Sequence, residues 1–347
     1  MRRIRYVDVM RGISIILIVA SHVMTYCDQL NLIYKLIYAF HVPVFFMISG
    51  FLANGGTEKL KTFFFKKVKR LVVPYLFYAL IFLLIYYLLG SFAIDALGTN
   101  NAIDIKTSLS EIAYGTAFDQ ALKQNSPLWF LPALFTTEMV FWFVFRIRKR
   151  LERTWIFDSF ILLLFVSLGE LINCFHFNLF FGMSSCLSLG VFYYLGYLLR
   201  KNENRIKKCF SFENIILLVI GLVIALFNDK VSYTDYRYGY YLLFVVAALF
   251  LSVYLLSLSK TIGNNKMLEK AGNNSMDIMI FHKIIVVALQ ILFIRLFSSS
   301  VRDNIASQIL FTIFATIIAV ILCLIIGRLL NVIRKKVSCK SVRRYEK

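Results

Sequence analysis

Histidine side chains inside the most apolar stretches are the first candidates for chemistry in this sequence. His22, His41 and His282 each lie within a run of residues long enough to cross a membrane. An ionisable side chain is costly in hydrocarbon and therefore usually faces a cavity, a partner or a substrate path. Imidazole also titrates near neutral pH and can accept the proton of a hydroxyl group. The fourth histidine, His176, lies in a short connecting stretch, and we assign it no role.

Asp8, Arg11 and His22 share one helical face in the first apolar run. Arg11 and His22 are eleven residues apart, and at about 100° per residue eleven steps return to within about 20° of the starting direction. The two side chains would lie about 16 Å apart along the axis. Asp8 precedes Arg11 by three residues and can form an ion pair with it. The pattern fits either a catalytic constellation or a structural network in which Arg11 extends to the inner membrane surface.

His41 lies in the second apolar run, two residues before Pro43. A short connection makes the first two runs antiparallel neighbours, which places His22 and His41 within about 5 Å of each other in depth. The two histidines could therefore share one pocket in the outer half of the membrane. Pro43 is expected to bend its helix and to free a carbonyl group. The small pair Ser49-Gly50 is expected to allow close helix packing.

A cluster of four cations, Lys66, Lys67, Lys69 and Arg70, precedes the third apolar run. Lysine and arginine bind phosphate oxygens, so Lys67 and Arg70 are candidates for holding the phosphates of a nucleotide. The alternative is a positive-inside topology signal that contacts anionic lipids.

The later polar residues give weaker patterns. His282 lies about two turns into the ninth apolar run. Asp277 precedes it by five residues, a spacing that does not bring the two side chains to one helix face. Glu138 and Glu170 also lie within apolar runs, and the sequence identifies no partner for either.

The elements that must position these side chains are transmembrane helices. Of the 347 residues, 59% are hydrophobic and 17% are charged, which is too little polar surface to cover a soluble fold. A helix needs about 20 apolar residues to cross the hydrocarbon. We therefore expect an all-α, polytopic integral membrane protein with one transmembrane domain over residues 1–347. The ten expected spans are 9–27, 33–53, 71–90, 127–145, 155–172, 179–199, 212–227, 240–258, 276–297 and 305–327.

Charge orients these spans. With the N-terminus in the cytosol, the inner stretches hold 31 lysine and arginine residues and the outer stretches hold 5. This bias follows the positive-inside rule and predicts that both termini are cytosolic, with 328–347 as a basic cytosolic tail. The formal net charge of +20 is thus a topology signal and predicts no nucleic-acid partner. We interpret the basic N-terminal segment as the first span rather than a cleaved signal peptide.

Cofactor and lid expectations follow from spacing. Six scattered cysteines indicate neither a disulfide framework nor a metal site. Three histidines at different depths do not form a ligand cluster, so we expect no metal and no permanently bound cofactor. The stretch 91–125 is the longest outer connection, and it is either a solvated connector or a lid that faces substrate.

Together these motifs resemble the membrane acyltransferase type 3 family over nearly the whole chain. The strongest match is the signature of the first helix. The family usually has arginine where this chain has Lys67. The matching residues are Asp8-x-x-Arg11-Gly12 with His22, the second-helix stretch 44–51 (VFFMISGF), and Lys67-x-x-Arg70-Leu71 with Pro74.

Two further stretches extend the resemblance. The segment from Asn274 to His282 is similar to a late family pattern, although Met279 and Ile280 stand where a tyrosine is common. His41 before Val-Pro, together with 128–135 (LWFLPALF), resembles the fucose 4-O-acetylase-like branch of the family.

The resemblance implies an O-acetyltransferase. It would move an acetyl group from cytosolic acetyl-CoA to a sugar hydroxyl of a cell-surface polysaccharide or its lipid-linked precursor. Such an enzyme would lie in the bilayer, and the composition and size fit the bacterial cytoplasmic membrane. The residues expected to be catalytic are His22, Arg11, Asp8 and His41. Those expected to bind the donor are Lys67, Arg70, Arg11 and His282.

A mechanism can be written on these residues. His22 would take the proton of the sugar hydroxyl, Arg11 would hold the pantetheine end of the donor, and the sugar would approach near His41. A covalent acetyl-histidine intermediate is an alternative to direct transfer. The alternative from another class is a transporter or exporter of lipid-linked sugars, since buried ionisable residues also suit a translocation path. Transporters typically contain inverted repeats, and none is visible in this sequence.

Overall fold

The computed structural model describes residues 3–97, 104–206 and 209–345, with side chains described except at 89–97, 205 and 333–345. These residues are almost entirely helical, and within them the only β-type pairing is an isolated bridge between Ser232 and Arg237. The chain forms two compact units, 1–31 with 264–347 and 32–263. Each unit is described below by itself.

Membrane-spanning segments dominate both units. Nine helical segments of the described chain are long and apolar enough to cross a membrane. The seventh predicted span, 212–227, coincides with the helix Phe212–Phe227, which is only 16 residues long. At 1.5 Å per residue this helix covers about 24 Å, less than the thickness of the hydrocarbon. The all-α polytopic architecture is confirmed, with nine full-length spans and one short apolar helix.

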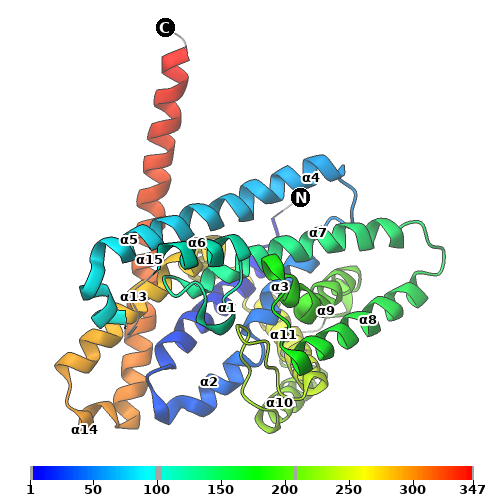
Figure 1. The fold of residues 1–347 in the computed structure, drawn as a ribbon. Helices are drawn as coiled ribbons and strands as arrows, with labels where there is room; N and C mark the ends of the chain where they lie inside the picture. The colour runs from blue at the N-terminus through cyan, green and yellow to red at the C-terminus, as the bar shows by residue number, and fades with distance from the viewer. Residues whose placement is uncertain (1–2, 98–103, 207–208, 346–347) are drawn as a thin grey trace. The chain divides into compact units, whose positions relative to one another are not determined.

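In the first unit, α1 packs against three later helices, α12, α13 and α15. Figure 1 shows α15 as one long helix that runs to Tyr345. Gly12 of α1 and Gly272 of α12 bring the two backbones into direct contact, because a Cβ atom on either glycine would collide with the other helix. The elements are α1 (Arg5–Met24), η1 (Asp28–Leu30), α12 (Lys266–Asn273), α13 (Ser275–Leu296), α14 (Ser299–Arg302) and α15 (Ile305–Tyr345).

The second unit contains the remaining helices. It includes α2 except for the first residue of that helix, Asn31. The elements up to the fourth span are α2 (Asn31–Tyr38), α3 (His41–Phe51), α4 (Leu60–Lys67), the π-helix η2 (Val68–Val72), α5 (Val73–Leu97), α6 (Ile105–Tyr114), η3 (Phe118–Gln120), η4 (Ser126–Trp129) and α7 (Phe130–Arg148). The later elements are α8 (Thr154–Phe175), η5 (Phe180–Gly182), α9 (Met183–Lys201), η6 (Glu203–Arg205), α10 (Phe212–Phe227) and α11 (Tyr241–Ile262).

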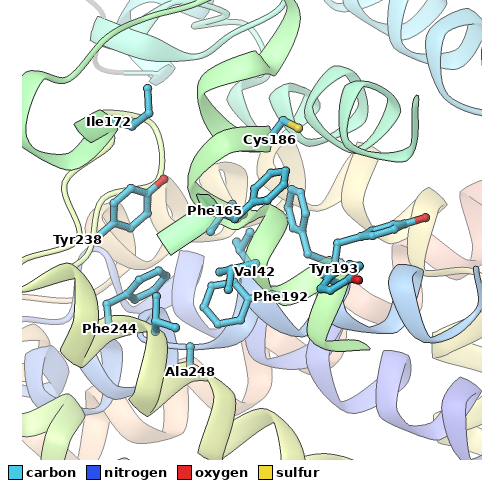
Figure 2. Packing of buried hydrophobic residues seen from close by; sticks show 14 of the residues in the cluster. Val42, Phe165, Ile172, Cys186, Phe192, Tyr193, Tyr238, Phe244 and Ala248 are labelled. Atoms are coloured by element: carbon cyan, nitrogen blue, oxygen red, sulfur yellow. The ribbon is translucent and has the colours of Figure 1, made fainter. Parts of the chain in front are cut away.

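The core of the second unit is built around α9. The helices α3, α7 and α8 pack against it. Phe141 of α7 stacks on Phe165 of α8 and on Tyr193 of α9, with ring centroids 4.8 and 4.9 Å apart. Figure 2 shows side chains from α3, α8, α9 and α11 meeting in one cluster. Each aromatic pair contributes roughly 0.5–1.5 kcal/mol beyond its buried area, so this cluster fixes the helices relative to one another.

Small residues allow α3 and α9 to approach closely. A Cβ atom on Gly50 would collide with the carbonyl oxygen of Tyr193, and one on Gly196 would collide with that of Met47. Two glycines on facing helices are the usual way in which membrane helices reach backbone contact. The close packing predicted from Ser49-Gly50 is therefore confirmed, and Gly50 is the residue that requires it.

Replacing Gly50 by alanine should destabilise the protein. The added methyl group has only backbone of α9 to displace, so α3 and α9 must separate, which should cost about 1–3 kcal/mol. The measurement is the melting temperature of the detergent-purified protein. Ser49→Ala is the matched control, because Ser49 is only half-buried. Equal melting temperatures for Gly50→Ala and Ser49→Ala would contradict the contact.

The second predicted span is wrong in one respect. Instead of one helix bent at Pro43, the chain forms α2 and α3 with a break at residues 39–40. His41 is the first residue of α3, so Pro43 lies in the first turn of a new helix. Proline is tolerated there because the N–H groups of a first turn have no partner within the helix. The bend thus comes before the proline rather than at it.

The two predicted connections beside the third span are also helical. The basic cluster at 66–70 lies in the continuous segment formed by α4, the π-helix η2 and α5, rather than in a loop. On the outer stretch, α6 packs against α5, and the hydroxyl of Tyr75 donates to the carbonyl of Ile112 at 2.6 Å. The Glu111 carboxylate accepts from the backbone N–H of the fully buried Leu122. The described part of 91–125 therefore makes specific contacts, although most residues of α6 are exposed. The choice between a solvated connector and a lid stays a prediction.

Candidate functional site

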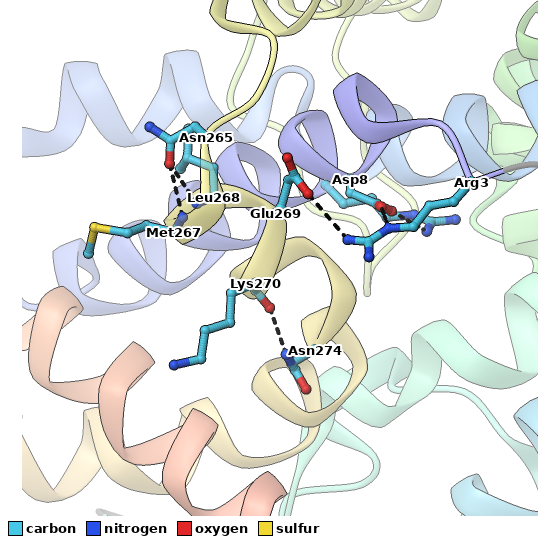
Figure 3. Close-up of polar contacts among 9 residues, drawn as sticks. Arg3, Asp8, Asn265, Met267, Leu268, Glu269, Lys270 and Asn274 are labelled. Atoms are coloured by element: carbon cyan, nitrogen blue, oxygen red, sulfur yellow. Dashed lines mark hydrogen bonds and ion pairs between the residues drawn. The ribbon is translucent and has the colours of Figure 1, made fainter.

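An ion-pair cluster joins the start of α1 to α12. Arg3 Nε donates to Asp8 Oδ2 at 2.7 Å, and its Nη2 donates to Glu269 Oε2 at 3.4 Å (Figure 3). The hydrogen bond from Arg3 to Asp8 raises the pKa of the Arg3 guanidinium. Arg11 Nη1 lies 3.5 Å from Asp8 Oδ1, so the predicted Asp8–Arg11 pair is confirmed. Asp8 is buried and holds both arginines at the same end of the helix.

His22 and His282 are in contact. Their ring centroids lie 5.0 Å apart with the planes tilted by 47°. The sequence predicted different depths for these histidines, and that prediction is wrong. Gly12 and Gly272 meet where α1 and α12 touch, and each histidine follows its glycine by ten residues. On α1 these ten residues span about 15 Å, while on the second segment they cross from α12 into α13. The ring contact shows that both segments carry an imidazole to the same level.

The ring of His282 has one satisfied and one unsatisfied nitrogen. Nδ1 lies 2.9 Å from the carbonyl oxygen of Ile278 and 3.0 Å from that of Met279. A carbonyl oxygen can only accept, so Nδ1 carries the hydrogen of the neutral ring and Nε2 carries the lone pair. Nε2 is buried and has no hydrogen-bond partner among the described residues. His282 thus presents an unused proton acceptor beside His22.

Gln290 holds the turn of α1 that carries His22. Its Nε2 donates to the backbone oxygen of His22 at 2.9 Å and to that of Val23 at 3.2 Å. The carbonyl groups of a last helical turn lack partners within the helix, and Gln290 of α13 supplies the missing donors. Sequence reasoning missed this residue. An amide side chain inside an apolar span is the signal that could have identified it.

His41 belongs to the second unit. Its Nδ1 lies 2.9 Å from the carbonyl oxygen of Ile37, and its ring packs edge-on against the rings of Tyr38 and Tyr233. The hydroxyl of Tyr233 donates in turn to the backbone oxygen of Tyr38, and burial raises the pKa of Tyr233. His41 is therefore locked among aromatic rings. The shared pocket of His22 and His41 stays a prediction, because the two residues lie in different units.

Lys67 and Arg70, both in the second unit, differ in how far their side chains are exposed. Lys67 Nζ lies 2.6 Å from Glu138 Oε1 of α7, with both side chains largely buried. The other carboxylate oxygen of Glu138 is buried without a hydrogen-bond partner in the described chain. Arg70, in the π-helix η2, is exposed. π-helical turns occur often at functional sites. Glu138 thus has a partner that the amino-acid sequence did not reveal. Of Lys67 and Arg70, Arg70 is the cation that solvent can reach.

Within the described residues, no group of three or more His, Cys, Asp or Glu side chains is placed to hold a metal ion. In the first unit two imidazole rings are in contact, and an arginine lies about 16 Å along the helix that carries His22. Imidazole groups in contact can pass a proton between them.

Comparison with known proteins gives the family. The family model described as an acyltransferase domain, type 3, matches residues 4–328. The matched residues include His22 and His282, the paired Asp8 and Arg11, and the π-helix η2 with Arg70. No curated protein and no solved structure is similar to the chain at a significant level. With nine apolar spans and this match over nearly its whole length, the chain belongs to the acyltransferase 3 family and is an integral membrane acyltransferase.

Proposed function

We propose that the protein is an O-acetyltransferase of the bacterial cytoplasmic membrane, from the fucose 4-O-acetylase-like branch of its family. It takes the acetyl group from cytosolic acetyl-CoA and transfers it to a sugar hydroxyl of a cell-surface polysaccharide or its lipid-linked precursor. The observation that carries the proposal is the contact between His22 and His282 in a chain of the acyltransferase family. Transfer to a hydroxyl needs a base within reach of the acceptor, and neutral imidazole is the side chain best suited to that task.

Each residue of the site has a proposed role. His22 accepts the proton as the sugar oxygen attacks the thioester carbonyl. Arg11, held by Asp8, binds the pantetheine end of the donor on the cytosolic side. Arg70 binds the nucleotide phosphates, since exposed guanidinium groups pair with phosphate oxygens in a bidentate fashion. Lys67 is already paired with Glu138, so Arg70 rather than Lys67 makes the principal contact with the phosphates.

Replacing Arg70 by alanine should weaken the binding of acetyl-CoA by about tenfold or more, because a hydrogen bond to a charged group contributes about 1.5–3 kcal/mol. Arg70 is a cleaner probe than Lys67, whose removal would leave the Glu138 carboxylate buried without its partner. The measurement is isothermal titration of acetyl-CoA into the protein in a sugar-free detergent, at fixed ionic strength. The proposed function predicts saturable binding to the wild type.

Lys61→Ala is the matched control, since Lys61 is an exposed cation of the same helical segment, nine residues earlier. It should leave the affinity within about twofold of the wild type, as expected for a distant surface charge. Equal weakening by Lys61→Ala and Arg70→Ala would show a diffuse charge effect and would refute the Arg70 site. Absence of any binding to folded wild-type protein would refute acetyl-CoA as the donor.

A further inference from the structure

A buried acceptor without a donor marks His282 for a role beyond packing. His282 has no exposed surface, yet its Nε2 makes no hydrogen bond to any described residue. Most buried polar atoms in folded proteins are satisfied, because a buried atom without a hydrogen bond lowers the stability of the fold. A chain that only needed to fill this space could use an apolar side chain. The lone pair on Nε2 therefore calls for a functional explanation.

The surroundings of the lone pair indicate what it accepts. The ring of His22 lies in direct contact with the ring of His282, at a centroid separation of 5.0 Å. The ring orientation of histidine varies broadly about χ2, so a modest rotation can align a nitrogen of His22 with Nε2 of His282. On the other side of the His282 ring, the carbonyl oxygens of Ile278 and Met279 fix the hydrogen on Nδ1.

We propose that His22 and His282 form a two-imidazole proton relay, in which His282 Nε2 is the final acceptor of the proton taken from the substrate hydroxyl. This inference rests on the proposed function and adds a second catalytic group to it. As the hydroxyl oxygen bonds to the thioester carbon, its proton moves to one ring nitrogen of His22. The hydrogen on the other nitrogen of His22 moves to His282 Nε2, so His22 stays neutral.

The relay closes when the donor leaves. Collapse of the tetrahedral intermediate breaks the C–S bond and releases the CoA thiolate. A thiolate is a stronger base than neutral imidazole, so the proton returns through His22 to sulfur. Both histidines are then neutral again, and no other reactant is consumed. While His282 carries the extra proton, its Nδ1–H still donates to two backbone carbonyl groups, which stabilise the imidazolium form.

Two substitutions separate a relay from simpler roles. In His282→Asn the side-chain amide can still donate to the carbonyls of Ile278 and Met279, but it offers no group at the position of Nε2. In His282→Gln the amide reaches the position of Nε2 and can accept a hydrogen bond from His22, but it cannot take a proton. A structural role would be restored by Asn, and an orienting role would be restored by Gln. A relay is restored by neither.

The experiment measures release of free CoA by the purified protein, with acetyl-CoA as donor and methyl fucopyranoside or methyl glucopyranoside as acceptor. Both variants should lose about 10²-fold or more in kcat, the usual contribution of a base, with KM for acetyl-CoA within about twofold of the wild type. Melting temperatures establish that both variants are folded. If either variant keeps kcat within about threefold of the wild type, the relay is refuted.

Failure of the relay and failure of the proposed function give different results. Wild-type protein that releases no CoA with either acceptor would count against the proposed function. The ring pair can be tested without turnover, by ¹⁵N resonances of histidine-labelled protein. Neutral His282 should carry its hydrogen on Nδ1, and its Nε2 resonance should move when His22 is replaced by alanine. A hydrogen on Nε2 instead, or an unchanged resonance, would overturn the inference.

Discussion

Replacing His22 by alanine should abolish acetyl transfer while the protein still folds. Removal of the imidazole takes away the group that receives the hydroxyl proton, and a positioned base contributes about 10²–10⁴-fold to the rate. The fold should survive because the contacts that hold this turn of α1 involve the backbone oxygen of His22. Gln290 and Thr25 donate to that oxygen in the variant as well. The measurement is CoA release from acetyl-CoA in the presence of the sugar acceptor.

A histidine elsewhere provides the control. His176 ends α8 in the left-handed region, with φ of 52°, and we assign it no catalytic role. Asparagine tolerates that backbone conformation better than most residues, so His176→Asn should fold. His176 is half-buried, so melting temperatures are compared as well. The variant should keep activity within about twofold of the wild type, because the residue is assigned no part in the reaction. Normal acetylation by His22→Ala would remove His22 from the mechanism altogether.

The sequence predicted the architecture well because hydrophobic length is a strong constraint. Every predicted span overlaps helical structure, and the helix at the seventh span has the predicted bounds, 212–227. The second span is the exception in form, since it consists of two helices. Helix breaks were harder to predict. At residues 39–40 the chain ends one helix and begins another without a glycine or proline at the break, and Pro43, the apparent breaker, lies just inside the new helix. Proline marks the neighbourhood of a break rather than its position.

The site was predicted in part. The pairing of Asp8 with Arg11 followed from local helix geometry and is confirmed. The contact between His22 and His282 joins residues 260 positions apart, and no spacing within one helix can predict it. It depends on where α12 docks against α1, which the collision-prone glycines Gly12 and Gly272 set.

Polar residues inside apolar spans were the signal used least fully. Gln290 and Lys283 both lie in α13, the helix that carries His282. A polar or charged side chain that faces lipid is energetically costly, so both residues should have been examined for partners. Glu138 was noticed but had no partner, because its partner Lys67 was assigned to a loop. Once the helix is extended back to Leu60, Lys67 lies within a spanning segment and needs a counter-charge. The third span was predicted to begin at residue 71 rather than at Leu60, and the Lys67–Glu138 pair was missed for that reason.

That ion pair gives the largest expected effect on stability. Lys67 and Glu138 are 12% and 7% exposed at their side chains and lie 2.6 Å apart. Lys67→Ala would leave the Glu138 carboxylate buried without its cation, and breaking a buried pair from one side typically costs about 3–5 kcal/mol. Glu138→Gln should cost less, because the long lysine side chain can extend toward the membrane surface. The double variant Lys67→Ala/Glu138→Gln removes both charges and should recover much of the stability that Lys67→Ala loses.

The melting temperatures of these three variants form a double-mutant cycle. A strong positive coupling is expected, with Lys67→Ala the least stable of the set. The same proteins also decide whether Lys67 binds the donor. If the double variant is stable and binds acetyl-CoA with wild-type affinity, Lys67 is a structural residue and the phosphates depend on Arg70. If the double variant is stable but binds weakly, Lys67 contributes to the donor site despite its partner. A Lys67→Ala variant as stable as the wild type would show that the two side chains are not paired. Lys67 and Arg70 would then both be available to bind the nucleotide phosphates.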